Sequence, residues 1–161
     1  MALEIIKGKK SEFSFTNEHL QRGHEQEPMA RMLYEIERNV DVTHCEFFDL
    51  GDYGDSPDGL VERDGVIEIK SVTGPPPVHF ATLQRGSFDP SYKWQLIGHL
   101  DCTGRNWVDF VSYCADFPEN KQLIIHRLQR KDCDEEISQL CIRRKDFLNL
   151  IGETIAIIQR G

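Results

Sequence analysis

The stretch from Ser56 to Ser71 constrains the fold of this chain most strongly. It reads SPDGLVERDGVIEIKS, and its Asp64-Gly65 pair is a strong signal for a two-residue hairpin turn. Residues 59–63 and 66–70 flank that turn and contain no proline. We therefore predict that they form two short antiparallel strands, joined as a central hairpin.

The alternation of side chains along the second strand sorts its residues between two faces. Glu68 and Lys70 share one face, whereas Ile67 and Ile69 point to the other, apolar face. Asp58 stands just before the first strand and follows a proline, whose restricted backbone helps to aim it. The hairpin is therefore expected to bring two carboxylates and a lysine to one spot.

Such a group has the composition of a metal site beside a phosphodiester. Hard divalent cations bind few protein carboxylates and prefer oxygen ligands, so Asp58, Glu68 and the backbone carbonyl of Ile69 are candidate ligands for Mg²⁺, with Mn²⁺ as the alternative. A bound metal activates a water and offsets phosphate charge, and Lys70 is suited to orient that water. A simpler interpretation stays open, because charged and apolar residues alternate on any half-solvated sheet.

Length and composition predict a single domain spanning residues 1–161. The sequence is 39% hydrophobic and 29% charged, and no apolar run approaches the ~20 residues needed to cross a bilayer. The N-terminus lacks the pattern of a secretory signal, so a cytoplasmic location is expected. Five cysteines form no CxxC pair and are expected to be reduced, mostly buried thiols. The net charge of −8 argues against a surface that attracts nucleic acid everywhere, but it allows a local basic groove.

The segment before the hairpin predicts a helix followed by a strand. Apolar residues recur at helical spacing over residues 18–38, where Pro28 is expected to kink or restart the helix and Asn39 to end it. Glu27 lies in this helix and either faces a metal or lies in solvent. Residues 40–50 are rich in Val, Thr and Phe, which predicts one continuous strand.

Two segments next to the hairpin predict irregular structure. Residues 51–59 are rich in glycine and aspartate and predict a turn. The local excess of acid at Asp49, Asp52, Asp55 and Asp58 fits a metal site, but it is equally typical of an exposed loop. The proline-dense segment 72–80 predicts a stiff loop, neither helix nor central strand, that is suited to wall a substrate groove. Arg85, just after it, is either a phosphate contact or an ordinary surface arginine.

Pro90 is suited to start the next helix. One face of that helix carries Tyr92, Gln95, Leu96, His99 and Leu100, which taken alone predicts a core helix with polar edges. Trp94 is expected in the core, with a place in the lining of the groove as the alternative. Residues 107–114 and 123–128 alternate cleanly and predict two further strands.

The C-terminal part predicts a long helix capped by Asp132 or Asp134. Its apolar stripe is expected to pack on the sheet or on a partner subunit. Just before it stand Arg127, Arg130 and Lys131, which belong either to a basic groove or to a solvated rim.

Four short pieces of sequence follow one another in a specific order. They are GHEQEPMA, SPDG, EIK and YKWQ, and they hold Gly23, Glu27, Ala30, Asp58, Glu68, Lys70, Tyr92 and Gln95. Their order and spacing resemble the core of the PD-(D/E)xK nucleases and, more narrowly, the phage lambda-type exonucleases of the YqaJ-like viral recombinase family. The resemblance implies an α/β (α+β) fold with a restriction-endonuclease-like core, in which helices flank a central mixed sheet.

The resemblance also implies a function. Members of this family are magnesium-dependent deoxyribonucleases that degrade one strand of linear double-stranded DNA, 5' to 3', in phage-type homologous recombination. They act with a single-strand annealing protein, and the lambda type forms a trimer around DNA, so a homo-oligomer in the cytoplasm of a bacterial host is expected. The N-terminal Arg and Ser/Thr pattern that binds the 5' phosphate in lambda-type enzymes is not found before Gly23, which leaves the polarity of digestion open.

Residue roles carry over from the family at the matching positions. Asp58 and Glu68 would hold the metal and Lys70 would assist the water. The resemblance implies Glu27 and Gln95 as further catalytic groups. The expected DNA contacts are Arg22, Arg85 and Tyr92.

Two other functions stay open. A restriction-like or structure-specific endonuclease on the same core would cut a closed circle, which an exonuclease must spare. A catalytically silent binding module would not need a complete set of Asp58, Glu68 and Lys70.

Overall fold

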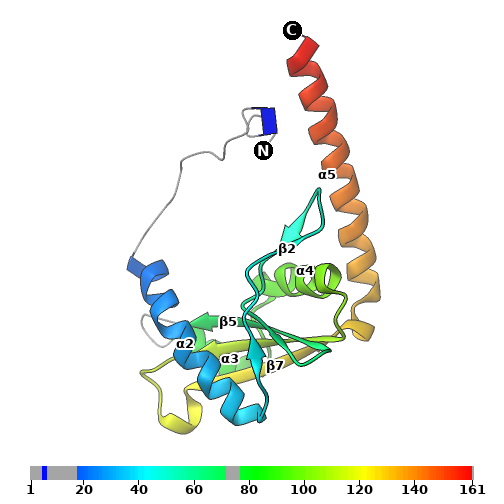
Figure 1. The fold of residues 1–161 in the computed structure, drawn as a ribbon. Helices are drawn as coiled ribbons and strands as arrows, with labels where there is room; N and C mark the ends of the chain where they lie inside the picture. Colours follow the sequence, from blue (N-terminus) through cyan, green and yellow to red (C-terminus); the bar gives the residue numbers. More distant parts are fainter. Residues whose placement is uncertain (1–4, 7–17, 72–76, 161) are drawn as a thin grey trace.

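A computed structural model describes residues 5–6, 18–71 and 77–160 of the chain. The elements along the main chain are, in order, α2 (Glu18–Arg38), β1 (Val42–Thr43), β2 (Phe48–Asp49), β3 (Gly54–Asp55), β4 (Gly59–Val61), β5 (Gly65–Ser71), α3 (Pro77–Arg85), η1 (Pro90–Tyr92), α4 (Lys93–Thr103), β6 (Trp107–Tyr113), η2 (Glu119–Lys121), β7 (Leu123–Gln129), η3 (Arg130–Asp132) and α5 (Asp134–Arg160). Figure 1 shows their arrangement.

A mixed five-stranded sheet forms the centre of the protein, in the order β1-β4-β5-β6-β7. β5 and β6 are parallel along their whole length, and every other neighbouring pair is antiparallel. Parallel neighbours need a crossover connection, which here includes α3 and α4. The predicted central mixed sheet flanked by helices is therefore confirmed.

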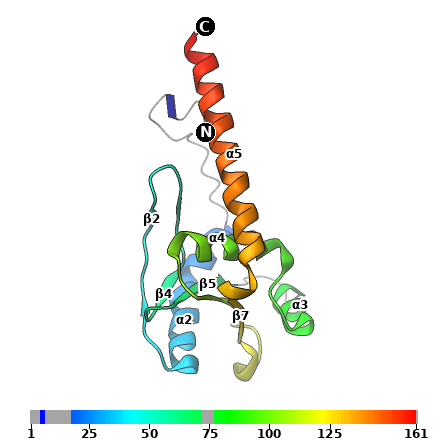
Figure 2. The same cartoon turned by 90° about the vertical axis from the view of Figure 1, so that its right-hand side faces the viewer.

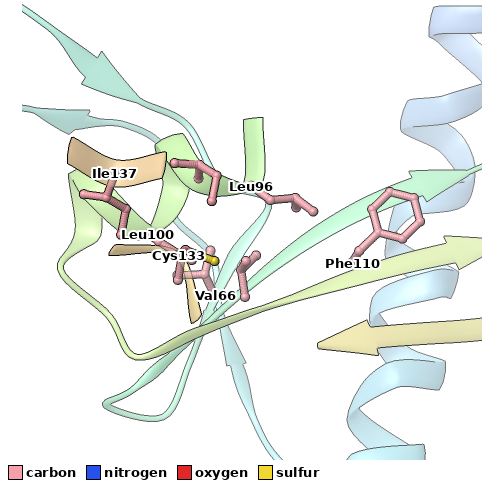
Figure 3. Close-up of a cluster of buried hydrophobic side chains, with 8 residues drawn as sticks. Val66, Leu96, Leu100, Phe110, Cys133 and Ile137 are labelled. Atoms are coloured by element: carbon pink, nitrogen blue, oxygen red, sulfur yellow. The ribbon is translucent and has the colours of Figure 1, made fainter. Parts of the chain in front are cut away.

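The two faces of the sheet bury separate apolar clusters. On one face α2 packs through Ala30 and Tyr34, and the strands contribute Val61, Ile67, Ile69, Val111 and Tyr113. On the other face α4 and the first turn of α5 cover the strands, with the cluster of Val66, Leu96, Ile97, Leu100, Val108, Phe110, Cys133 and Ile137 (Figure 3). Because the strands are covered on both faces, β5 is apolar except for Glu68, Lys70 and Ser71 near its end.

The register of the central hairpin differs from the prediction. Val61 pairs with Gly65, so the turn consists of residues 62–64, and Gly65 belongs to β5. Glu62 takes a positive φ of 47° within this turn. The predicted pair of antiparallel strands is confirmed. The turn between them is at residues 62–64, and the predicted turn at Asp64-Gly65 is wrong.

Contacts with distant residues explain this shift. The Arg105 guanidinium donates hydrogen bonds to the backbone carbonyls of Val61, Glu62 and Gly65 at 2.9–3.2 Å, which holds the wider turn. The Trp107 ring lies over Gly65, where an added Cβ would be 2.1 Å from the ring. Glycine is thus required in the strand for close packing, not in the turn.

The strand predicted over residues 40–50 is split. Only Val42–Thr43 pair with β4, which is itself three residues long. Phe48–Asp49 pair instead with Gly54–Asp55, and Gly51 with a φ of 87° lies in the loop between them. Residues 51–59 therefore include the loop and second strand of a small hairpin where an irregular turn was predicted, because strand pairing depends on an available partner as well as on propensity.

The loop predicted over the proline-dense residues 72–80 is wrong for residues 77–80, which are helical. Residues 72–76 lie outside the described part of the chain, and the helix α3 begins at Pro77, where proline is well tolerated. His79 is completely buried in this helix. Its ring nitrogens lie 2.8 Å from the Ser112 hydroxyl and 2.8 Å from the Lys121 carbonyl, so it holds α3 on the sheet.

The helices otherwise follow the predicted pattern. α2 continues through Pro28 without a restart, and Asn39 with a φ of 53° ends it in the left-handed conformation. Trp94, expected in the core, is 38% exposed. All five cysteines are free thiols, as predicted, but only Cys114 and Cys133 are buried, where mostly buried thiols were expected.

The helix α5 starts on the sheet and then extends away from the body of the protein (Figures 1 and 2). Of the predicted apolar stripe, Ile137 and Ile151 are buried, whereas Phe147 and Ile158 are 48% and 43% exposed. The predicted stripe is therefore only partly buried. None of the helices described here is both long enough and apolar enough to span a membrane.

Candidate active site at the end of β5

Asp58 is fixed at the entrance to β4 by hydrogen bonds from two neighbouring elements. Its carboxylate accepts the backbone N–H of Ile69 on β5 at 2.6 Å. Its carbonyl accepts a hydrogen bond of 2.7 Å from Arg31 on α2, and Arg31 also pairs with Glu27 at 2.9 Å. The predicted residues Asp58, Ile69 and Glu27 therefore lie in one connected group.

Glu68 points from β5 toward α4 and is 2% exposed. Its Oε1 accepts from Lys70 Nζ at 2.5 Å and from Gln95 Nε2 at 2.7 Å. The alternation predicted for β5 thus places Glu68 and Lys70 together, and α4 adds Gln95. Lys70 is 28% exposed, so it forms the more accessible part of this buried group.

His99 and Asp55 belong to the same group, although sequence reasoning did not assign them to it. His99 Nε2 lies 2.8 Å from Glu68 Oε2, and its Nδ1 lies 2.6 Å from Asp55 Oδ2. The available signal was the spacing on α4, because His99 follows Gln95 by four residues and shares its helical face. Asp55 comes from the small hairpin at β3, and its only signal was the local excess of aspartate, which is equally typical of an exposed loop.

The carboxylates of the site are electrostatically coupled. Burial and the nearby charge of Glu68 raise the pKa of Asp58 to about 6, against the opposing effect of the Ile69 N–H. Burial tends to raise the pKa of Glu68 too, but the hydrogen bond from His99 and the charge of Lys70 bring it below its usual value. Burial tends to lower the pKa of His99, and its hydrogen bonds to Asp55 and Glu68 outweigh burial and raise it to about 9.

The donor set fits a hard divalent cation. Among the described residues, no group of three or more His, Cys, Asp and Glu side chains is arranged to hold a metal. Asp58 and Glu68 are instead a pair, and their repulsion contributes to the raised pKa of Asp58. A cation would offset that repulsion and complete its shell with the Ile69 carbonyl and water, as Mg²⁺ prefers.

Tyr92 lies beside the acidic group and packs into it. Its ring centroid is 5.0 Å from Lys70 Nζ and 5.4 Å from the ring of Phe110. This places Tyr92 where a cation–π contact restrains the lysine. A contact between Tyr92 and DNA stays a prediction.

The other two predicted DNA contacts lie on helices. Arg85 ends α3 and pairs with Asp89 at 3.4 Å, and both side chains are 38% exposed. Arg22 lies in α2, but its side chain is outside the described part of the structure. Their roles in DNA binding stay predictions.

Arg127 does not line a groove beside the acidic group. It makes two hydrogen bonds, of 2.7 and 2.8 Å, with Asp109, which also accepts from the Tyr34 hydroxyl at 2.8 Å. Its guanidinium lies 3.5 Å from the centre of the Trp107 ring. Since Tyr34 comes from α2, this network is on the face of the sheet opposite Glu68, and its position supports a structural role.

Arg130, next along the chain, is also used inside the fold. Its guanidinium donates to the Leu100 carbonyl near the end of α4. Its position joins the end of β7 to α4. The interpretation of Arg127 and Arg130 as a basic groove at the site is therefore not supported by their contacts.

Comparison with known proteins places the chain in a family. The family model of the YqaJ-like viral recombinase domain matches residues 1–106. The crystal structure of an alkaline exonuclease, LHK-Exo, from Laribacter hongkongensis is 33% identical with a TM-score of 0.88, and the match covers 99% of this chain and 79% of that one. The complex of LHK-Exo with dAMP gives the same identity and TM-score and is covered to 80%.

A second protein is similar in fold. A phage related exonuclease from Haemophilus somnus 129PT is 17% identical with a TM-score of 0.71, over 96% of this chain and 80% of that one. A search of the curated proteins gave no match. The family match over most of the chain and the identity to LHK-Exo agree with the four sequence pieces described above. The chain therefore belongs to the YqaJ-like viral recombinase domain family.

Proposed function

We propose that this protein is a metal-dependent exonuclease that degrades one strand of linear double-stranded DNA, from 5' to 3', in phage-type recombination. The convergence of Asp58, Glu68, Lys70 and Gln95 at the end of β5 carries the proposal. The similarity to LHK-Exo, an alkaline exonuclease, supports it. That enzyme has been crystallised with dAMP, a nucleotide of the kind released when a DNA strand is digested.

Each residue has a role that follows from its position. Asp58 and Glu68, with the Ile69 carbonyl, would hold Mg²⁺ or Mn²⁺, which when bound lowers the pKa of a coordinated water and offsets charge on the phosphate. Lys70 is held between Glu68 and the Tyr92 ring, so its charge is available for the attacking water or the developing phosphate charge.

Gln95 and Glu27 would act beside the two proposed ligands. Gln95 donates to Glu68 Oε1 and thereby restrains the side chain of that carboxylate. Glu27 contributes negative charge near Asp58. Arg31 donates hydrogen bonds both to the Glu27 carboxylate and to the backbone carbonyl of Asp58. Both residues therefore shape the acidic group that would receive the cation.

One assay tests the activity. Linear duplex DNA with and without a 5' phosphate, labelled at either end, is incubated with the protein and Mg²⁺, Mn²⁺ or a chelator, alongside a closed circle. We expect metal-dependent release of nucleotides from the 5' end of the linear DNA and an intact circle. A linearised circle would indicate an endonuclease, and release from the 3' end would contradict the proposed polarity.

We also propose a homo-oligomer, a trimer by resemblance to the lambda type. The far half of α5 supports association, because it leaves Phe147, Leu150 and Ile157 largely exposed. The double variant Leu150→Glu/Ile157→Glu should convert the oligomer to a monomer in light scattering. A variant with Glu153→Gln, on the same helix, serves as the control, and a monomeric unchanged protein would contradict this proposal.

A single-strand annealing protein is the proposed partner, because digestion of one strand leaves the other available for annealing. Sedimentation of the two purified proteins together should give a complex that neither forms alone. Separate sedimentation at all concentrations would contradict the partnership. A phage or prophage origin and a cytoplasmic location in a bacterial host belong to the same proposal.

A further inference from the structure

The imidazole of His99 connects two carboxylates from distant parts of the chain. It is 1% exposed, with Nε2 2.8 Å from Glu68 and Nδ1 2.6 Å from Asp55. Ionised carboxylates only accept hydrogen bonds, so the ring donates from both nitrogens. His99 is therefore restrained at both ends and cannot turn without losing a hydrogen bond.

This contact limits how Glu68 can bind anything else. A carboxylate has about four acceptor positions, and Lys70 and Gln95 take two on Oε1 while His99 takes one on Oε2. The position that is left lies on Oε2. The orientation that His99 imposes on Glu68 thus decides where a cation can find a free lone pair.

The position of Asp55 depends on the small hairpin of β2 and β3. Asp55 lies on β3, which pairs only with β2 within the described residues and stands apart from the main sheet. Tyr53, in the same hairpin, has its ring 3.7 Å from the Arg144 guanidinium of α5. Arg144 also pairs with Asp101 of α4 at 2.5 Å. The hairpin is therefore held against two helices, and its position fixes Asp55.

We propose that Asp55 and His99 are positioning residues, which hold Glu68 in the orientation that presents Oε2 to the catalytic cation. The inference rests on the proposed cation site. It assigns a role to two residues that lie outside the four matched sequence pieces. Groups that orient metal ligands in this way typically contribute about 10-fold to 100-fold to metal affinity.

The test is calorimetric titration of the full-length protein with Mn²⁺, without DNA, alongside turnover on linear duplex DNA. His99→Leu removes the donor to Glu68, and we expect Mn²⁺ binding weaker by about 10-fold to 100-fold, with a matching loss of turnover at limiting metal. Asp55→Ala leaves the imidazole in place but unrestrained, and should shift affinity in the same direction by less.

Asp55→Asn is the conservative variant. The asparagine amide can donate to Nδ1, which leaves the proton on Nε2 for Glu68, so Mn²⁺ affinity should remain close to that of the unchanged protein. Asp109→Asn is the matched control, because it makes the same change at the Arg127 ion pair on the other face of the sheet and leaves the contacts of Asp55, His99 and Glu68 intact. It should lower thermal stability and leave Mn²⁺ affinity unchanged.

The outcomes separate this inference from the proposed function. If the unchanged protein binds no Mn²⁺, the proposed function fails and the positioning role falls with it. If the unchanged protein binds Mn²⁺ and folded His99→Leu and Asp55→Ala bind it equally well, only the positioning role is overturned. Equal weakening of Mn²⁺ binding by Asp55→Asn and Asp55→Ala would also overturn the positioning role. The asparagine should keep His99 in place, so the orientation of Glu68 would then not determine the affinity.

Discussion

The backbone N–H of Ile69 donates to the carboxylate of Asp58 at 2.6 Å, across the two strands of the central hairpin. This bond places Asp58 directly beside the residue that follows Glu68. Two carboxylates that are ten positions apart in the sequence are thereby held as a pair. Burial, together with the nearby charge of Glu68, raises the pKa of Asp58.

Asp58→Asn should abolish cation-dependent cleavage while the protein stays folded. The amide oxygen can still accept the Ile69 N–H, so the backbone is kept, but the negative charge that would bind the cation is lost. Cleavage of labelled linear DNA and circular dichroism measure the two effects. Unchanged cleavage by a folded variant would remove Asp58 from the site.

The stability of the metal-free protein should depend on pH through Asp58. Because its pKa is raised from 3.8 to about 6 in the folded protein, the folded state binds more protons than the unfolded state between these values. This group therefore favours folding most at low pH, and its contribution is lost as pH rises through the folded pKa.

Comparison with Asp58→Asn isolates this effect. In chelator, the variant should be more stable than the unchanged protein at about pH 8, with a smaller difference at about pH 4. Mn²⁺ at the higher pH should stabilise only the unchanged protein. Urea unfolding measures both, and equal pH dependence of the two proteins would contradict the raised pKa.

Lys70→Ala should slow the chemical step more than it weakens metal binding. Its ammonium pairs with Glu68 and would stabilise charge on the water or phosphate, so we expect single-turnover rates lower by about 10²-fold to 10³-fold at saturating metal. Lys93→Ala, which breaks a pair with Glu136, is the control. Weaker Mn²⁺ affinity with an unchanged single-turnover rate would show that this role is wrong.

Arg127→Ala should destabilise the fold without changing how DNA binding depends on salt. It leaves the fully buried Asp109 with only the Tyr34 hydroxyl among the partners described above, and breaking a buried pair in this way costs about 3–5 kcal/mol. Adding Asp109→Asn should restore part of the lost stability. A reduced salt slope with unchanged stability would instead make Arg127 a phosphate contact.

Arg85→Ala, unlike Arg127→Ala, should leave the stability of the fold nearly unchanged. The arginine is accessible and its pair with Asp89 is on the surface, so stability should change by less than about 1 kcal/mol. If Arg85 contacts a phosphate, the salt slope of DNA binding should fall by about one. Fluorescence anisotropy across a salt series measures this, and an unchanged slope would exclude the contact.

Local pattern was enough to predict much of this protein. The alternation in residues 66–70 correctly placed Glu68 and Lys70 together on one face of β5. Helical spacing correctly placed Gln95 and His99 on one face of α4. These features depend on the geometry of single elements, which a short stretch of sequence determines by itself.

The tertiary structure determined which contacts those elements make with one another. The hairpin register depends on Trp107 and Arg105, which lie about 40 residues beyond the turn. His99 connects Asp55 to Glu68 because a separate hairpin packs beside α4. Arg127 donates to Asp109 on the other face of the sheet. The sequence determined which side chains each element can present. The packing of distant elements determined which partners those side chains contact. The periodicity of a helix or a strand contains no information about contacts between residues far apart along the chain.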